Sequence, residues 1–158
     1  MEEILKKFDL DNLLLHEYKN WYLLLRKEQV TLGSLVLIEK KFNTKFSQIS
    51  IESFSELGEI TNDIESILKE VFAYDKINYL MLMMVDKEVH FHIIPRYSKN
   101  TIWDKSIFID YDWPKPPDLL KFNIITEKKL MKLKEFLKGK FERKNSSFNS
   151  QSNFNESY

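Results

Sequence analysis

The sequence contains no cysteine, only three glycines and four prolines, and no apolar run long enough to span a membrane. Without cysteine no disulfide framework can form, which fits the cytoplasm, where we expect this protein. The charged first residues, 1–7, lack the apolar centre of a signal peptide. Lys plus Arg and Asp plus Glu each number 24. This zero net charge argues against bulk electrostatic binding to nucleic acid.

What the chain has is enough apolar material for one globular domain. It is 158 residues long, with 43% hydrophobic and 14% aromatic residues. A chain of this length buries roughly 70% of its unfolded surface. We expect a single domain over residues 1–141. The remaining residues, 142–158, are rich in Ser and Asn and predict a disordered tail.

The spacing of apolar residues predicts an α+β fold. Helical spacing after the N-cap candidate Ser50 predicts a long helix over residues 51–73, and Thr126 begins a C-terminal helix. A short amphipathic helix is expected over 1–8, and a loop over 103–118. Apolar or alternating runs predict strands over residues 13–18, 21–26, 34–39, 77–85 and 88–96. The fourth of these is apolar at nearly every position, with Asn78 as a polar exception, and reads as buried on both faces.

Two of only three histidines stand two residues apart in the last of these runs. On a strand, successive side chains point to opposite faces. Glu88, His90 and His92 therefore share one face, while Phe91 and Ile93 point to the core. We expect the histidine face to be polar and to lie outside the core.

Three interpretations fit these histidines. They are ordinary residues on a solvated strand face, or Glu88, His90 and His92 bind a metal, or His90 is a catalytic nucleophile oriented by His92. One strand rarely supplies a closed metal shell, and only His16 remains as a further imidazole. A neutral imidazole is a good nucleophile near pH 7.

The wider sequence favours the nucleophile. The run His90–Arg96 resembles the second and third histidines, and the apolar ending, of the histidine triad (HIT) signature. The runs Trp21–Arg26 and Val30–Leu37 resemble the paired strands and glycine turn of the same superfamily, so that the resemblance covers residues 13–97. The ending Ile94–Arg96 resembles the diadenosine polyphosphate hydrolase branch. Two further segments, 76–87 and 112–118, resemble a bacterial subgroup.

This resemblance implies a HIT-like fold with about five mostly antiparallel strands, one long helix and a C-terminal helix. It implies a cytoplasmic homodimer that hydrolyses or transfers a nucleotidyl group at an α-phosphate, through a phosphohistidine on His90. The substrate would be a diadenosine polyphosphate or a nucleoside phosphoramidate. No cofactor is required, although Mg²⁺ can accompany a polyphosphate. The first triad histidine is replaced here by Glu88, which either supports His90 or selects less charged substrates.

The resemblance also indicates which residues contact the nucleotide. The candidates are Arg26, Lys27, Ser34, Asn78 and Arg96. The phosphate-holding loop of better-studied members is reduced here to a turn at residues 86–87, and a family histidine after the glycine is replaced by serine. These departures leave an alternative open, in which the chain is a nucleotide-binding homodimer with little or no turnover.

Overall fold

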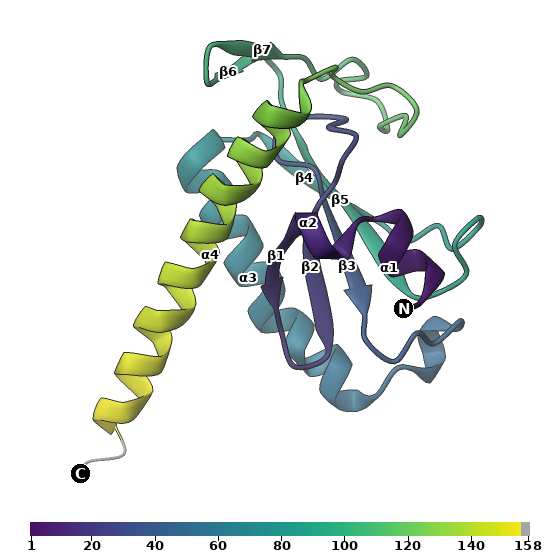
Figure 1. Ribbon diagram of the computed structural model, residues 1–158, viewed down its shortest axis with the longest axis vertical. Helices are drawn as coiled ribbons and strands as arrows, with labels where there is room; N and C mark the ends of the chain where they lie inside the picture. Colours follow the sequence, from purple (N-terminus) through teal and green to yellow (C-terminus); the bar gives the residue numbers. More distant parts are fainter. Residues whose placement is uncertain (156–158) are drawn as a thin grey trace.

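The computed structural model describes the backbone of residues 1–155 and the side chains of residues 1–146. Its centre is a five-stranded antiparallel sheet in the order β1-β2-β3-β5-β4 (Figure 1). The strands of this sheet are β1 (Leu14–Glu17), β2 (Trp21–Leu25), β3 (Leu35–Glu39), β4 (Lys76–Leu80) and β5 (His90–Arg96). The helices are α1 (Glu3–Lys7), α2 (Leu10–Leu13), α3 (Ile51–Phe72) and α4 (Glu127–Asn155), with a 3₁₀ turn η1 (Phe46–Gln48). The predicted α+β fold is confirmed.

Both long helices begin at the residues that the sequence indicates. The Ser50 hydroxyl accepts a hydrogen bond from the Ser53 backbone N–H at 3.1 Å. The Thr126 hydroxyl accepts from the Lys129 backbone N–H at 3.1 Å. Each bond satisfies one of the free donors in a helix's first turn, which fixes where the helix starts.

Helices α3 and α4 cover one face of the sheet with the larger core. Their apolar residues pack on alternate positions of the strands, as period-two side chains require. The sheet contributes Leu23, Leu25, Leu35, Leu37 and Ile93, and α4 contributes Leu130, Leu133, Leu137 and Phe141. This face holds most of the buried apolar residues, and its core includes Ile93 of β5.

The opposite face of the sheet is covered by the N-terminal helix α1 (Figure 1). A second core joins helix and sheet there, made of Ile4, Leu5, Phe8, Leu24, Val36 and Ile38. In the register of β3 and β5, His90 lies opposite Ile38 and His92 opposite Val36. The histidines therefore share this smaller core, and the expectation that their face lies outside the core is wrong.

The predicted strand over residues 77–85 is also corrected. Strand β4 ends at Leu80 and lies at the edge of the sheet, half-exposed, with β5 as its neighbour. Residues 81–89 form a loop in place of a tight turn. Met84 and Val85 in this loop are 81% and 85% exposed. An apolar composition does not distinguish a buried strand from an apolar loop at the rim of a pocket.

Two further segments differ from expectation. The stretch 103–118, predicted as a loop, begins within a hairpin of β6 (Thr101–Trp103) and β7 (Ser106–Phe108). It continues after β7 as a loop. Helix α4 continues to Asn155, through most of the segment 142–158 predicted to be a disordered tail; residues 156–158 lie outside the described part. Buried Phe141 anchors the helix just before this segment. Lys138 and Glu142, one helical turn apart at the start of the segment, form an ion pair of 4.0 Å.

None of the helices within residues 1–155 combines the length and the apolar character that crossing a membrane requires.

Candidate active site

His90 and His92 lie together on β5 beneath α1. Their ring centroids are 5.0 Å apart and the rings are nearly perpendicular, at 81°. The side chain of Phe8 contacts both rings, with a centroid distance of 5.9 Å to each. His90 is 2% and His92 7% exposed. This enclosure removes both imidazoles from bulk water, which distinguishes them from histidines on a solvated face.

A backbone carbonyl fixes the tautomer of His90. His90 Nδ1 lies 2.6 Å from the backbone oxygen of Glu88. A carbonyl oxygen only accepts hydrogen bonds, so Nδ1 carries the proton and donates. In the neutral ring, Nε2 then has a free lone pair. His90 is thus prepared to act as a nucleophile or base through Nε2.

His92 is held in the opposite tautomer by a cation. Arg26 Nε donates to His92 Nδ1 at 3.4 Å, which leaves the proton of the neutral ring on Nε2. Burial lowers the pKa of His92 to about 4, with the positive charges of Arg26 and His90 adding to the effect. His92 is therefore neutral at pH 7 and offers an N–H donor on Nε2, in a ring whose centroid lies 5.0 Å from that of His90.

Arg26 is itself positioned by its neighbours. It is buried, and its guanidinium donates to the Glu28 backbone oxygen at 2.8 Å and lies 3.8 Å from the Glu28 carboxylate. Burial lowers its pKa, an effect that the Glu28 charge opposes. The guanidinium is a fixed positive charge behind His92, at the end of β2.

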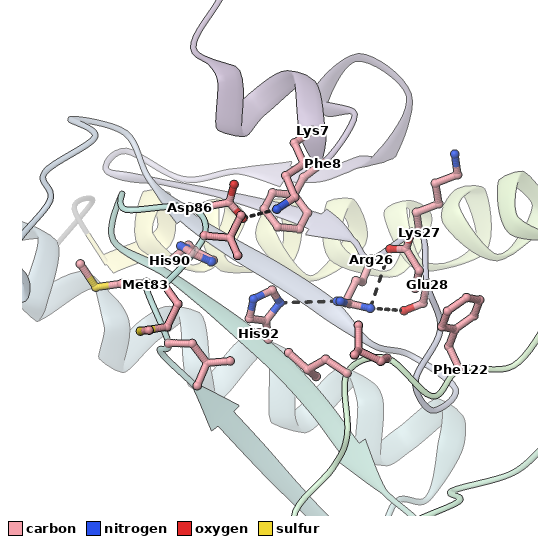
Figure 2. A pocket seen from close by; sticks show the side chains of 15 residues that line it. Lys7, Phe8, Arg26, Lys27, Glu28, Met83, Asp86, His90, His92 and Phe122 are labelled. Atoms are coloured by element: carbon pink, nitrogen blue, oxygen red, sulfur yellow. Dashed lines mark hydrogen bonds and ion pairs between the residues drawn. The ribbon is translucent and has the colours of Figure 1, made fainter.

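These groups line a pocket with a volume of about 420 Å³ (Figure 2). Its lining residues are Lys7, Phe8, Arg26, Lys27, Glu28, Leu82, Met83, Met84, Val85, Asp86, His90, His92, Leu119, Leu120 and Phe122. Beside the β5 histidines, four segments distant in sequence form its walls: the N-terminal helix, residues 26–28 after β2, the loop before β5 and the loop before α4. Several of its apolar side chains are exposed, including Met84 at 81% and Leu120 at 86%. An exposed apolar rim around polar groups is typical of a ligand site.

Of the residues predicted from sequence, four line this pocket: His90, His92, Arg26 and Lys27. Glu88 is not among its lining residues, and it contacts His90 through its backbone oxygen. Strand β5 begins only at His90, so the strand alternation used to place the Glu88 carboxylate beside it does not extend that far.

Ser34 is not among the lining residues either. It is fully buried in the glycine turn, where its hydroxyl donates to the Thr31 carbonyl at 2.8 Å and accepts from the Thr31 backbone N–H at 3.0 Å. These bonds give Ser34 a structural role in the turn, and it is not placed to contact a ligand beside the histidines.

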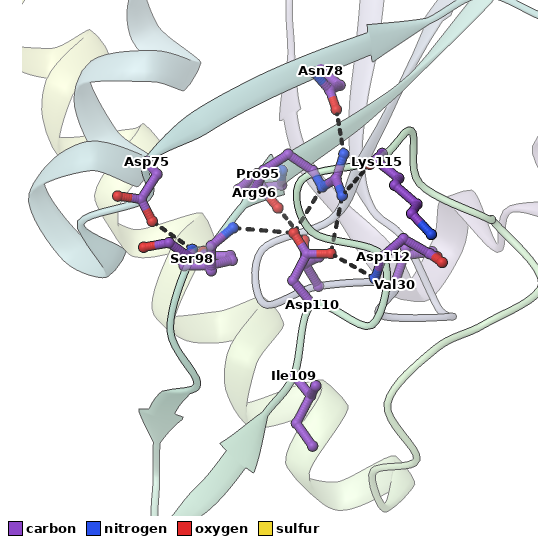
Figure 3. A network of polar contacts seen from close by, with 12 residues as sticks. Val30, Asp75, Asn78, Pro95, Arg96, Ser98, Ile109, Asp110, Asp112 and Lys115 are labelled. Carbon is purple, nitrogen blue, oxygen red and sulfur yellow. Dashed lines mark hydrogen bonds and ion pairs between the residues drawn. The ribbon is translucent and has the colours of Figure 1, made fainter.

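Asn78 and Arg96 belong to a separate network (Figure 3). Arg96 forms a buried two-point ion pair with Asp110, at 2.8 and 3.1 Å, and donates to the Asn78 side-chain oxygen at 2.8 Å and the Lys115 carbonyl at 2.7 Å. This network ties the loop after β7 to strands β4 and β5. Neither residue lines the histidine pocket.

The metal interpretation finds no support in the geometry. Across the residues whose side chains the structure describes, no three His, Cys, Asp or Glu groups are arranged to hold a metal ion. Glu88 in particular does not join the two imidazoles at the pocket.

Sequence reasoning missed the pocket residues supplied by other segments. Lys7 and Asp86 form an ion pair of 2.5 Å at the pocket, and Phe8 covers the histidines. The amphipathic pattern of residues 1–8 places Phe8 on an apolar helix face, but it does not say which surface this face covers. The contact is a product of tertiary packing.

Comparison with known proteins identifies the fold. No protein-family model and no curated protein matches the sequence. Among solved structures, a histidine triad protein from Bradyrhizobium japonicum has a TM-score of 0.67 at 17% identity, covering 89% of this chain and 96% of that one. One from Sinorhizobium meliloti also has a TM-score of 0.67 at 17% identity, covering 90% and 94%. A hypothetical histidine triad nucleotide-binding protein from Sulfolobus tokodaii has a TM-score of 0.64 at 17% identity, covering 88% and 89%. The chain therefore has the fold of histidine triad proteins.

Proposed function

We propose that the chain is a histidine triad enzyme that binds a nucleotide in this pocket and transfers or hydrolyses its nucleotidyl group through His90. The observation that carries the proposal is the pair of opposite tautomers. His90 presents a lone pair on Nε2, because its Nδ1–H donates to the Glu88 carbonyl oxygen. His92 presents an N–H on Nε2, because its Nδ1 accepts from Arg26. A nucleophile beside a hydrogen-bond donor is what attack on a phosphoryl group requires.

In the proposed first step, the His90 Nε2 lone pair attacks the α-phosphorus. A P–N bond forms, the bond to the leaving group breaks, and the leaving group departs with the electron pair; an amine leaving group also takes up a proton from solvent. Positive charge develops on the His90 ring and is stabilised by the hydrogen bond from Nδ1 to the Glu88 carbonyl. The N–H of His92 donates to a phosphoryl oxygen.

In the second step, water attacks the same phosphorus. The P–N bond breaks, its electrons return to His90, and the water proton passes to solvent. Splitting one displacement into two easier ones is the advantage of a covalent intermediate. An imidazole nucleophile needs no metal for its activation, and Mg²⁺ would enter only as a companion of a polyphosphate substrate.

The pocket lining supports a substrate with an apolar, flat part, such as a nucleobase. Phe8, Met83 and Phe122 line the pocket together with the exposed side chains at its rim. Flat bases stack on aromatic and thioether surfaces. We propose a diadenosine polyphosphate or a nucleoside phosphoramidate as the substrate class, and a homodimer as the working form.

A binding protein with little turnover is the second candidate. It is favoured by Glu88, which stands at the first triad position and is absent from the pocket lining. The two candidates share the pocket and the bound nucleotide, and they differ in whether His90 forms a bond to phosphorus.

The test uses diadenosine tetraphosphate and adenosine 5′-phosphoramidate, each labelled at the α-phosphate. We expect turnover of at least one and an alkali-stable label on the protein after rapid quenching. His90→Asn should abolish both signals, because an amide cannot act as the nucleophile. His16→Asn is the matched control, since His16 lies on β1 and is not among the pocket residues. Binding of AMP without turnover of either substrate would support the binding protein.

A further inference from the structure

Lys7 and Asp86 meet at the pocket from segments 79 residues apart in the sequence. Lys7 Nζ donates to Asp86 Oδ2 at 2.5 Å, and both side chains line the pocket (Figure 2). Lys7 stands at the C-terminal end of α1, and Asp86 belongs to the loop before β5. The Lys7 side chain is 48% exposed and that of Asp86 17%. The pair is thus accessible from the pocket's opening.

Both charges act on His92, and Lys7 also lies near the aromatic ring that covers the two imidazoles. Lys7 Nζ lies 5.6 Å from the Phe8 ring centroid, and that ring contacts His90 and His92. Asp86 raises and Lys7 lowers the pKa of His92, as secondary effects beside burial and Arg26. The ion pair therefore lies close enough to the imidazoles to interact electrostatically with a charged group bound beside them.

The other cations of the pocket are differently placed. Arg26 is buried, and it is engaged by the Glu28 backbone and by His92. Lys27 is exposed at the rim. Lys7 combines exposure with a carboxylate partner, and a carboxylate presents two oxygens and one negative charge, as part of a phosphate group does.

We propose that Lys7 is a phosphate-binding residue and that Asp86 occupies the position of the phosphate until a nucleotide arrives. This inference rests on the proposed function and adds a specificity device to it. The nucleotide phosphate replaces Asp86 as the partner of Lys7. Asp86 then stays beside the phosphate as an unpaired anion and disfavours substrates with many negative charges. The substrate class is therefore a nucleotide with one charged phosphoryl group, such as a phosphoramidate.

The energetics permit this exchange. A partly exposed ion pair contributes little to stability, so replacing its anion costs little. Helix α1 is held on the sheet by the apolar side chains of Ile4, Leu5 and Phe8, independently of the ion pair. A conformational rearrangement of the helix is not needed for Lys7 to change partner.

Calorimetric titration of AMP and of adenosine into the full-length protein tests the inference. Lys7→Gln should raise the Kd of AMP about tenfold, the loss of one charge-assisted hydrogen bond, and leave the Kd of adenosine unchanged. Asp86→Asn should lower the Kd of AMP, because its competitor for Lys7 has lost its charge. Lys6→Gln is the matched control on the same helix; Lys6 pairs with Glu3 at 3.1 Å and does not line the pocket. Melting temperatures verify that each variant is folded.

The opposite signs of the two variants distinguish ligand binding from a structural ion pair. If the pair merely fastens α1 to the loop, both variants weaken AMP and adenosine alike, and the inference is overturned. An unchanged Kd of AMP in Lys7→Gln also overturns it, while the proposed function stands. A wild-type protein that binds neither ligand overturns both. With turnover established, Asp86→Asn should also increase kcat/KM for diadenosine tetraphosphate more than for the phosphoramidate.

Discussion

Two histidines on one strand acquire different chemistry from what each Nδ1 meets. The Glu88 carbonyl oxygen accepts a hydrogen bond from one ring, and the Arg26 guanidinium donates a hydrogen bond to the other. The imidazoles are chemically identical in the unfolded chain, so their division of roles is a property of the folded site. A substitution of Arg26 should therefore change the tautomer of His92 directly and leave the hydrogen bond that fixes the tautomer of His90 in place.

The lowered pKa of His92 predicts a pH-dependent stability. Its pKa is about 4 in the folded protein and near 6.5 in the unfolded chain, so the unfolded state binds more protons between these values. The free energy of unfolding should therefore fall as the pH drops from about 6.5 to 4, by up to about 3 kcal/mol from this residue. Denaturant unfolding across this range measures the loss.

His92→Gln provides the comparison, because it removes the titrating group. Burial also lowers the pKa of His16, so part of the acid loss will persist in the variant. The difference between the two curves isolates the contribution of His92. Parallel curves for wild type and variant would contradict a lowered pKa at this position.

At the scale of single residues, the sequence predicts which side chains share a face but not what covers that face. The alternation around Phe91 correctly places His90 and His92 together, opposite the large core. The carboxylate that the loop before β5 brings to the pocket is Asp86, two residues before the expected Glu88, because the loop departs from strand geometry there. Local periodicity carries no information about such a loop.

At the scale of elements, the turn between β2 and β3 depends on Gly33. Its φ is +86°, a region that side chains rarely adopt, and a Cβ atom there would lie 2.9 Å from Phe72 at the end of α3. The missing side chain lets the turn approach the helix closely. The hairpin that carries Arg26 toward the pocket thus packs directly on the long helix.

Gly33→Ala should lower the free energy of unfolding by roughly 2–4 kcal/mol, since backbone strain and overpacking add. Gly58→Ala is the matched control within α3, where a Cβ would meet no atom within 4 Å. It should stabilise the protein by up to about 1 kcal/mol through helix propensity. Equal effects of the two substitutions would show that neither conformation nor crowding distinguishes these glycines.

The elements differ in how far their sequence determines them. The long helix is specified locally, by the Ser50 cap and the apolar spacing that follows it. The extent of β4 is not, because its length depends on how far β5 runs beside it. The apolar residues after Leu80 therefore predict a strand where the structure has a pocket rim.

At the scale of the whole molecule, a buried ion pair joins the loop after β7 to the central sheet. Arg96 and Asp110 are 4% and 3% exposed, and Asp110 also accepts from the Tyr97 backbone N–H at 3.1 Å. The same loop continues toward Leu119 and Phe122, which form one wall of the pocket. The network thus helps to position the pocket wall formed by Leu119 and Phe122, although its own residues do not line the pocket.

Asp110→Asn should lower the free energy of unfolding by about 3–5 kcal/mol, because it leaves the Arg96 charge buried without its counter-ion. Lys132→Gln is the control: it breaks the exposed pair with Asp104 and should cost less than about 1 kcal/mol. Chemical denaturation of both variants gives the comparison. A loss no larger in Asp110→Asn than in Lys132→Gln would rule out a stabilising role for the buried pair.

Because the pocket wall is built from four segments distant in sequence, a bound ligand would link its own supply to the survival of the protein. The proposed nucleotide would be held between the N-terminal helix, residues 26–28, the loop before β5 and the loop before α4, so it would bind only when all four are assembled. By mass action, a ligand at a hundred times its Kd adds about 2.7 kcal/mol to the free energy of unfolding. Cells rich in the nucleotide would then keep more of this chain intact against proteases, so its abundance would follow the concentration of its own ligand.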